Sequence, residues 1–387
     1  MRMICQMLLI VGLLAASTAV APSKSPPPPA LPRTWVPPSP AALAVQSAID
    51  EAVRASRAVL VLPEGEVRFN DAALNVTGAH GLSIGGAATG TTLIFRPGVG
   101  VRVQNCTGTT LHSLAVDYSP LPYVHGAVVA TPGGDDVRAP GSVTVRLDEQ
   151  SLTFEELLAH YPPHDTWPPV TAYAKGTLDF KATVGQWGRA PVFTRLSPAA
   201  DREYSLQSPE AHSLAEGDVV VAPTRTGFTV TLSWTANVTL RDVTLFAAGN
   251  MAITEFQGGG GNVYENVSLV PRGPSTPLAS NADGFHSSGL RRGPTLHKVR
   301  MHNLLDDYFN VHNTFQLVAK RASPRSLLVG DFQYLAGDNT LYVRSAPRAP
   351  LVRGQLCLYG RSDAGFAHQA WLAAVLRVHG DGARQCR

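Results

Sequence analysis

The chain has 387 residues, of which 44% are hydrophobic and 16% are charged. A chain of this length and composition can bury a large apolar core, so the balance excludes an intrinsically disordered protein. The formal net charge of +3 comes from arginines scattered along the chain without a basic run. This distribution predicts neither a nucleic-acid partner nor binding to an anionic membrane surface.

Residues 1–21 have the layout of a secretory signal peptide. Arg2 precedes an apolar run over residues 7–16, and small residues follow the run. The run is too short to cross a membrane comfortably. We therefore expect a secreted, extracellular protein with no membrane association beyond this segment. Because Pro22 would hinder cleavage directly after Ala21, an uncleaved signal anchor stays open as the alternative.

Cysteines and glycosylation sequons are compatible with an oxidising, extracellular compartment. Outside the signal segment, an odd number of cysteines allows one disulfide and one free thiol, in a pairing that the sequence leaves open: Cys106, Cys357 and Cys386. Four Asn-x-Ser/Thr sequons begin at Asn75, Asn105, Asn237 and Asn266. They predict a glycoprotein if the host glycosylates.

The folded part begins after a proline-rich segment. Residues 22–40 predict an extended linker without a core of its own. Apolar side chains then recur at helical spacing over residues 41–53, behind a Ser39 cap and with Pro40 in the first turn. This pattern predicts an amphipathic helix of about four turns, which would cap the fold. A short buried strand closed by a turn is expected over residues 58–65.

A repeat runs through the β-rich remainder of the chain. Residues 237–245 match residues 262–269, with equivalent valines 24 residues apart. The same template returns at residues 294–301, and residues 110–116 resemble it. A period of this length is typical of one rung of a parallel β-helix, in which each rung buries its apolar side chains against the next. The sequence therefore predicts an all-β solenoid, with its N-terminal cap and first rungs in residues 41–116.

Two stretches leave this template. Residues 117–226 carry strand patterns without the repeat and predict an inserted β module. Residues 314–387 predict a second small β module. Between the two modules, residues 227–313 should form the β-helix rungs that carry an acidic site.

Two acidic segments stand out in those rungs. Asp283 lies in Asn281–His286, and Asp306 and Asp307 lie in Leu305–His312, with 24 residues separating the first and third acids. Carboxyl groups gathered in one place can protonate a leaving group and activate a water, which is the chemistry of glycoside hydrolysis. These aspartates are therefore the candidate catalytic residues. The alternative is that both segments are turns between rungs, where Asp and Gly are common.

When the two acidic segments are aligned with this 24-residue offset, other residues match as well as the acids. Phe285 falls beside Phe309, and His286 beside Asn310, on neighbouring rungs about 4.8 Å apart. Matching phenylalanines would fix the register that holds the acids together. Strand alternation points Asp306 outward and Asp283 and Asp307 inward, unless a turn before the phenylalanines changes the alternation. The sequence leaves that orientation open.

Further polar residues near the acids are candidates for substrate binding. They follow the acids in the chain or lie about one rung upstream: His286, Tyr308, Asn310, His312 and Glu255. For Glu255 a solvated rung edge is the alternative. No spacing of His and Cys argues for zinc, and we expect neither a metal nor a cofactor.

Three segments resemble the bacterial α-1,3-galactosidases of glycoside hydrolase family 110, namely residues 116–123, 281–287 and 306–312. More distantly, Asn-x-Asp followed by Asp-Asp is similar to the polygalacturonases of the pectin-lyase-like fold. The resemblance implies a right-handed parallel β-helix interrupted by β-barrel insertions and metal-independent hydrolysis with inversion at the sugar carbon. It also implies catalytic roles for Asp283, Asp306 and Asp307.

The chain departs from these families in two respects. It has no Gly-His-Gly and no Arg-x-Lys block after the Asp-Asp pair, which argues against pectin-type substrate recognition. It also ends soon after the second module, where family members would return to further rungs. We therefore expect a fragment or a reduced relative, with a truncated C-terminal module.

These observations together predict a secreted, galactosidase-like, inverting glycoside hydrolase that acts on a polysaccharide or oligosaccharide. A polysaccharide lyase of the same fold is one alternative, since it would use such carboxylates to bind Ca²⁺ or to neutralise a uronate beside a Lys or Arg base. A non-catalytic β-helical glycan-binding or surface protein is another. The sequence does not indicate the glycan, its linkage or the oligomeric state.

Overall fold

The computed structural model describes residues 35–131, 141–149, 151–156, 170–177, 179–185, 192–196, 202–273, 276–312, 317–323, 326–330, 332–334 and 341–343. The predicted signal segment, residues 22–34 of the proline-rich linker, and two cysteines, Cys357 and Cys386, lie outside these residues. In the described part, no helix is long and apolar enough to cross a membrane. The described chain is mostly β-strand and divides into two compact units, with the boundary in the sequence after residue 313.

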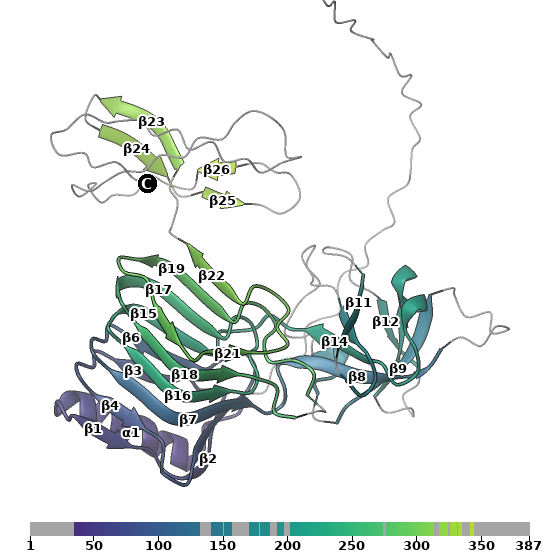
Figure 1. The fold of residues 1–387 in the computed structure, drawn as a ribbon, viewed down its shortest axis with the longest axis horizontal. Helices are drawn as coiled ribbons and strands as arrows, with labels where there is room; N and C mark the ends of the chain where they lie inside the picture. Colours follow the sequence, from purple (N-terminus) through teal and green to yellow (C-terminus); the bar gives the residue numbers. More distant parts are fainter. Residues whose placement is uncertain are drawn as a thin grey trace, which may run out of the picture. The chain divides into compact units, whose positions relative to one another are not determined.

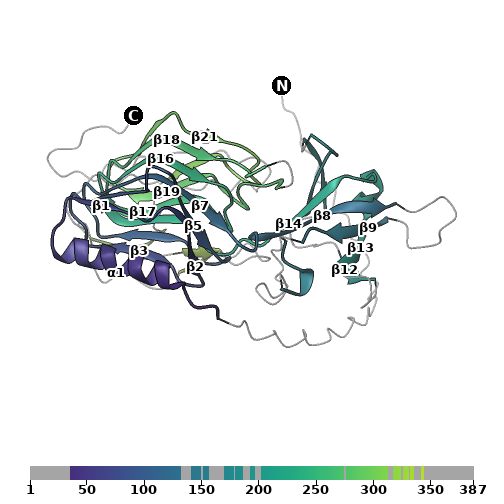
Figure 2. The ribbon, with the colours of Figure 1, turned by 90° about the horizontal axis from the view of Figure 1, so that it is seen from below.

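Two parallel sheets make up the main part of the first unit (Figures 1 and 2). Sheet A has nine strands: β1 (Val59–Val61), β2 (Gly65–Asn70), β4 (Ser83–Gly85), β5 (Thr91–Phe95), β7 (Thr110–Tyr118), β16 (Thr239–Leu245), β18 (Val263–Leu269), β20 (Thr295–His297) and β21 (Arg300–Met301). Sheet B has six strands: β3 (Leu74–Thr77), β6 (Val101–Gln104), β15 (Val230–Ala236), β17 (Ile253–Gly260), β19 (Phe285–Leu290) and β22 (Phe309–His312).

The chain passes alternately through the two sheets, and each strand pairs in parallel with a strand of a neighbouring pass. In sheet A, Val243 of β16 lies beside Val267 of β18 and, on its other side, beside Leu114 of β7. The next strand, β20, continues this order with Thr295 beside Val263. The repeat register predicted from the sequence is therefore confirmed for all four segments.

Apolar side chains in matching register form the core of these sheets. In sheet B, five side chains from successive strands are each no more than 2% exposed: Leu74, Val101, Val230, Ile253 and Phe285. They belong to one hydrophobic cluster with the buried residues of sheet A. Each strand thus buries its inward side chains against the strand before it, which is why the short repeats fold only as a set.

The predicted amphipathic helix is α1 (Pro40–Arg54), which packs against β1, β2 and β3. The hydroxyl of Ser39 accepts a hydrogen bond from the Ala42 N–H at 3.2 Å, so the expected cap is present. The strand expected next is β1, but it is not buried. Val59 and Val61 are 61% and 64% exposed because they lie on the outer face of sheet A, beside Ser83 and Gly85, whereas Leu60 lies beside the buried Ile84 and packs against the core.

Sheets A and B together are called the stack below. A seven-stranded antiparallel sheet interrupts the stack between β7 and β15 (Figure 1). Its strands run in the order β11-β10-β14-β8-β9-β13-β12 and are β8 (Tyr123–Ala130), β9 (Ser142–Leu147), β10 (Val170–Tyr173), β11 (Phe180–Val184), β12 (Val192–Arg195), β13 (Glu203–Gln207) and β14 (Val219–Pro223). A short 3₁₀ helix, Pro209–Ser213, packs against it. Because most of its apolar residues form a cluster separate from the core of the stack, we call this sheet the inserted module.

The segment that enters the inserted module is fixed to the stack by two buried tyrosines. The Tyr118 hydroxyl donates to the carbonyl of Val99 at 2.9 Å, and the Tyr123 hydroxyl donates to the carbonyl of Leu278 at 3.1 Å. Burial raises the pKa of both phenols. Residues 116–123 therefore have a structural role at the root of the inserted module.

The described residues of the second unit form two pairs of antiparallel strands. One pairs β23 (Leu317–Ser323) with β24 (Ser326–Gly330), and the other pairs β25 (Phe332–Tyr334) with β26 (Leu341–Val343).

The first unit also contains one of the cysteines and all four glycosylation sequons. Cys106 is buried as a free thiol, and burial raises its pKa. The asparagines of the four sequons are all exposed: Asn75, Asn105, Asn237 and Asn266.

Two buried aspartates have pKa values shifted in opposite directions. Burial raises the pKa of Asp117, although its ion pair with Arg272 at 2.6 Å opposes the rise. Burial also acts on Asp218, but there the bond from Lys181 and backbone N–H donors outweigh it and lower the pKa.

The pH dependence of stability should therefore differ between Asp117→Asn and Asp218→Asn. A raised pKa means that the folded state holds the proton more tightly, so the stability of the wild type relative to Asp117→Asn should fall as the pH rises above the ordinary value of 3.8. A lowered pKa adds stability above the unfolded-state value, which is lost as the pH falls through the folded-state value. Urea unfolding between about pH 3 and 7 measures both differences. If the stability difference between wild type and variant changed with pH in the same direction for Asp117→Asn and Asp218→Asn, the opposite pKa shifts of the two aspartates would be contradicted.

Candidate active site

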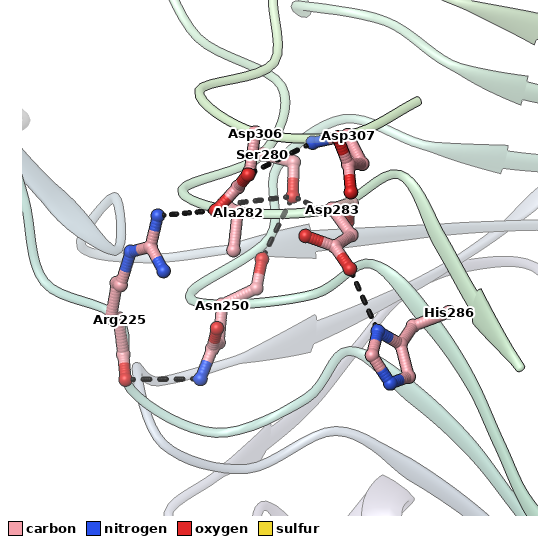
Figure 3. A network of polar contacts seen from close by, with 8 residues as sticks. All are labelled: Arg225, Asn250, Ser280, Ala282, Asp283, His286, Asp306 and Asp307. Carbon is pink, nitrogen blue, oxygen red and sulfur yellow. Dashed lines mark hydrogen bonds and ion pairs between the residues drawn. The ribbon is translucent and has the colours of Figure 1, made fainter. Parts of the chain in front are cut away.

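Three aspartates meet where β19 and β22 begin (Figure 3). One carboxylate oxygen from each of Asp283, Asp306 and Asp307 lies within 4.8 Å of the other two. Asp283 is only 3% exposed, whereas Asp306 and Asp307 are exposed. The fold therefore gathers the three acids into one cluster that solvent can reach.

The pairing of β19 with β22 brings the acids together. Phe285 lies beside Phe309, with ring centroids 6.4 Å apart, as the sequence overlay predicts. Just before these phenylalanines, the Gly284 N–H donates to the carbonyl of Asp307 at 2.9 Å. The two acidic segments are thus joined by the same parallel hydrogen bonding as the strands that follow them.

A bend before β19 turns the side chain of Asp283 outward. Strand alternation begins at the buried Phe285, and the next residue, His286, points away from the core with its Nδ1 2.7 Å from Oδ2 of Asp283. The bend leaves no room for a side chain at Gly284, where a Cβ would lie 2.5 Å from Sδ of Met301. The bend therefore resets the alternation that would have aimed Asp283 inward.

Arg225 is a member of the cluster that the sequence reasoning missed. Its Nη2 lies 2.7 Å from Oδ2 of Asp306, and Oδ1 of Asp306 accepts from the Asp307 N–H at 3.2 Å. Arg225 follows the last strand of the inserted module and is 81 residues from Asp306 in the chain. No periodicity or motif around Arg225 indicates this contact.

Four of the predicted binding residues lie beside the acids. Nε2 of His312 is 3.1 Å from Nε2 of His286, and Asn310 lies beside His286 in the β19 and β22 pairing. Tyr308 directly follows the acidic pair and is 49% exposed. These side chains are placed where they could contact a molecule bound at the aspartates.

The prediction that Glu255 binds substrate is wrong. Glu255 shares the inward face of β17 with Ile253 and is 0% exposed. Its Oε1 accepts from the Asn262 amide at 2.8 Å and from the Tyr264 hydroxyl at 2.6 Å. Burial, and then the adjacent carboxylate, raise the pKa of Tyr264 well above its ordinary value. Glu255 belongs to a polar network inside the core.

Aromatic rings continue from the acids to β17 and to the segment that precedes β15. The ring of His286 is 6.1 Å from that of Phe256, which is 5.7 Å from that of Phe228. Phe256 and Phe228 are partly exposed. This aromatic column offers apolar surface beside the polar cluster.

Comparisons with known proteins give little further guidance. No family model matches the chain, and no curated protein matches it. Among solved structures, it is similar to a protein from Parabacteroides merdae whose assignment as a glycosyl hydrolase is itself provisional. That likeness has a TM-score of 0.29 and 9% sequence identity, and it covers 68% of this chain and 87% of the other.

Proposed function

We propose that this chain is a secreted glycoside hydrolase built on a right-handed parallel β-helix, with β modules at residues 117–226 and 314–387. The observation that carries the proposal is the clustering of Asp283, Asp306 and Asp307, whose carboxylate oxygens lie within 4.8 Å of one another at a solvent-accessible place. A pair of carboxyl groups is the minimum that glycoside hydrolysis requires, one to protonate the leaving oxygen and one to activate water.

The contacts of the three acids suit different roles. Asp306 bonds a guanidinium, an interaction in which a carboxylate serves as the acceptor. Asp307 is exposed and can hold a water together with Asp306. We therefore place the attacking water on this pair. Asp283, held at His286, is left to deliver the proton to the leaving group.

The stereochemical outcome is a separate part of the proposal. The resemblance to family 110 implies inversion, but inverting enzymes usually separate their carboxyl groups by about 6.5–9.5 Å and retaining enzymes by about 5 Å. The present oxygens lie within 4.8 Å, so the distance gives no support to inversion. We propose inversion on the resemblance alone and expect the β-anomer of galactose as the first product of an α-galactoside. NMR of the fresh hydrolysate would show the α-anomer first if the enzyme retains.

A carbohydrate substrate is supported by the surroundings of the acids. Sugars present both hydroxyl groups and apolar faces, and they are bound by polar side chains combined with aromatic rings. His286, His312 and Asn310 supply the polar groups, and Phe256 and Phe228 supply rings. We propose a galactose-containing polysaccharide or oligosaccharide as the substrate.

The test is a screen of the secreted protein on α-galactosides and on plant and algal polysaccharides. An Asp306→Asn/Asp307→Asn variant serves as the matched control, since it keeps the shapes of the side chains but removes both carboxylates. We expect release of reducing sugar by the wild type only. Glycan binding without turnover by either protein would favour the non-catalytic alternative.

A polysaccharide lyase is the second candidate, and one observation favours it. Three carboxylates with oxygens this close could also hold a divalent cation, and the cationic Arg225 lies beside them. A lyase of this kind would lose activity on chelation with EDTA and would form an unsaturated product. We expect full activity after EDTA treatment and a saturated product.

A further inference from the structure

We infer that Arg225 is a positioning residue for Asp306, so that the root of the inserted module is part of the active site. This inference rests on the proposed function, because it concerns the same acids. Neither the motifs nor the repeat assign any role to Arg225.

Two hydrogen bonds hold the carboxylate of Asp306, one at each oxygen. Nη2 of Arg225 bonds Oδ2 of Asp306 at 2.7 Å, and the Asp307 N–H bonds Oδ1 at 3.2 Å (Figure 3). The side chains of Arg225 and Asp306 are 25% and 39% exposed. Charge-assisted bonds of this kind fix orientation as well as adding attraction. With both oxygens bonded, rotation of the Asp306 carboxylate about its side-chain axis is restricted.

The backbone of Arg225 is itself held in an unusual conformation. Its φ is +51°, in the left-handed region that residues other than glycine, asparagine and aspartate rarely adopt. The carbonyl of Arg225 accepts from the Asn250 side-chain amide at 3.2 Å. Conformations of this kind persist where surrounding contacts hold them, and the bond from Asn250 is such a contact. The backbone of Arg225 is therefore held in place as well as its side chain.

The same network continues to the segment that carries Asp283. The carbonyl of Asn250 accepts from Oγ of Ser280 at 2.8 Å, and the Ser280 hydroxyl also lies 3.2 Å from the carbonyl of Asp283 (Figure 3). Arg225 is thus linked to Asp306 by its side chain and to the Asp283 segment through its backbone.

Both ends of the inserted module converge on this network. The side-chain amide of the fully buried Asn281 lies 2.6 Å from the carbonyl of Pro122, 3.1 Å from Oγ1 of Thr224 and 3.0 Å from the carbonyl of Gly249. Pro122 directly precedes the first strand of the module, and Thr224 directly follows the last. The placement of Arg225 is therefore fixed by the point where the module joins the stack.

The expected consequence is catalytic rather than structural. Partly exposed ion pairs add little to the stability of folding. Misplacing a reacting group by about 1 Å, in contrast, can slow a reaction about a hundredfold. Loss of the Arg225 side chain should therefore lower kcat while leaving substrate affinity and folding nearly unchanged.

The experiment compares two Arg225 variants with a matched control on the substrate that the screen identifies. Arg225→Asn removes the charge but tolerates the left-handed backbone, whereas Arg225→Lys keeps a charge. Arg241→Asn removes another arginine of the stack, which is exposed and lies 3.9 Å from Asp242. For Arg225→Asn we expect kcat to fall about 10- to 100-fold, with KM changed less than about threefold. Arg225→Lys and added guanidinium ion should each restore part of kcat, and Arg241→Asn should match the wild type.

The outcomes separate this inference from the proposed function. A wild type that hydrolyses its substrate beside an Arg225→Asn variant with unchanged kcat would overturn the role of Arg225 alone. A rise in KM at constant kcat would also overturn it, since Arg225 would then bind substrate. A wild type inactive on every glycan would overturn the proposed function and this inference together. If Arg225→Asn does not fold, Arg225→Gln replaces it as the neutral variant under the same criteria.

Discussion

Replacing Asp283 by asparagine should lower kcat about a thousandfold, within the range that general acid catalysis contributes. Asparagine has nearly the same shape and can still bond His286, whose Nδ1 lies 2.7 Å from Oδ2 of Asp283. It cannot deliver a proton to a leaving oxygen. Steady-state rates on the substrate found by the screen, with circular dichroism to confirm folding, would measure the effect.

Asp242→Asn is the control for this substitution. Asp242 is exposed on β16, and its backbone has a φ of +54°, a conformation that asparagine also tolerates. Its rate should equal that of the wild type. If Asp283→Asn kept more than about a tenth of the wild-type kcat, Asp283 could not be the proton donor.

Replacing Phe285 by alanine should destabilise the protein by about 3–5 kcal/mol. Phe285 is 0% exposed, and its ring meets that of Tyr264 edge to face with centroids 4.9 Å apart. The substitution removes a large buried surface and leaves a cavity between the two sheets. Urea unfolding followed by tryptophan fluorescence would give the difference in free energy.

Phe309→Ala tests whether the loss depends on burial rather than on the residue type. Phe309 occupies the same register position on the next strand of sheet B but is 51% exposed. Its removal should cost about 1 kcal/mol. Equal losses for the two variants would show that Phe285 is not the residue that anchors this part of the core.

The all-β class and the strand register could be predicted because the repeat carries both of them locally. Equivalent valines at a 24-residue offset, and phenylalanines at the same offset, mark side chains that must lie against each other. The errors arose where burial depends on which face of a strand a side chain occupies. Val59 lies on the outer face of β1, whereas its neighbour Leu60 packs against the core. Glu255 is charged and seemed suited to the surface, but its register places it inside, where Asn262 and Tyr264 bond it.

The candidate site could be predicted only in part. Asp283 and the Asp306–Asp307 pair are close in the repeat, so sequence spacing is enough to bring them together. The outward direction of Asp283 depends on a bend at Gly284 that strand alternation does not describe. Arg225 meets Asp306 only through the folding of the inserted module against the stack, a tertiary contact without a local pattern.

The direct pairing of β7 with β16 has an evolutionary consequence. Thr110 lies beside Thr239 in an unbroken parallel ladder, although the whole inserted module separates these strands in the sequence. The ladder would therefore survive the loss or replacement of the module in a single genetic event. Relatives of this protein could therefore carry a different domain at this place beside the acids. Among the residues of the module, only the few where the chain leaves and rejoins the ladder would be constrained by catalysis.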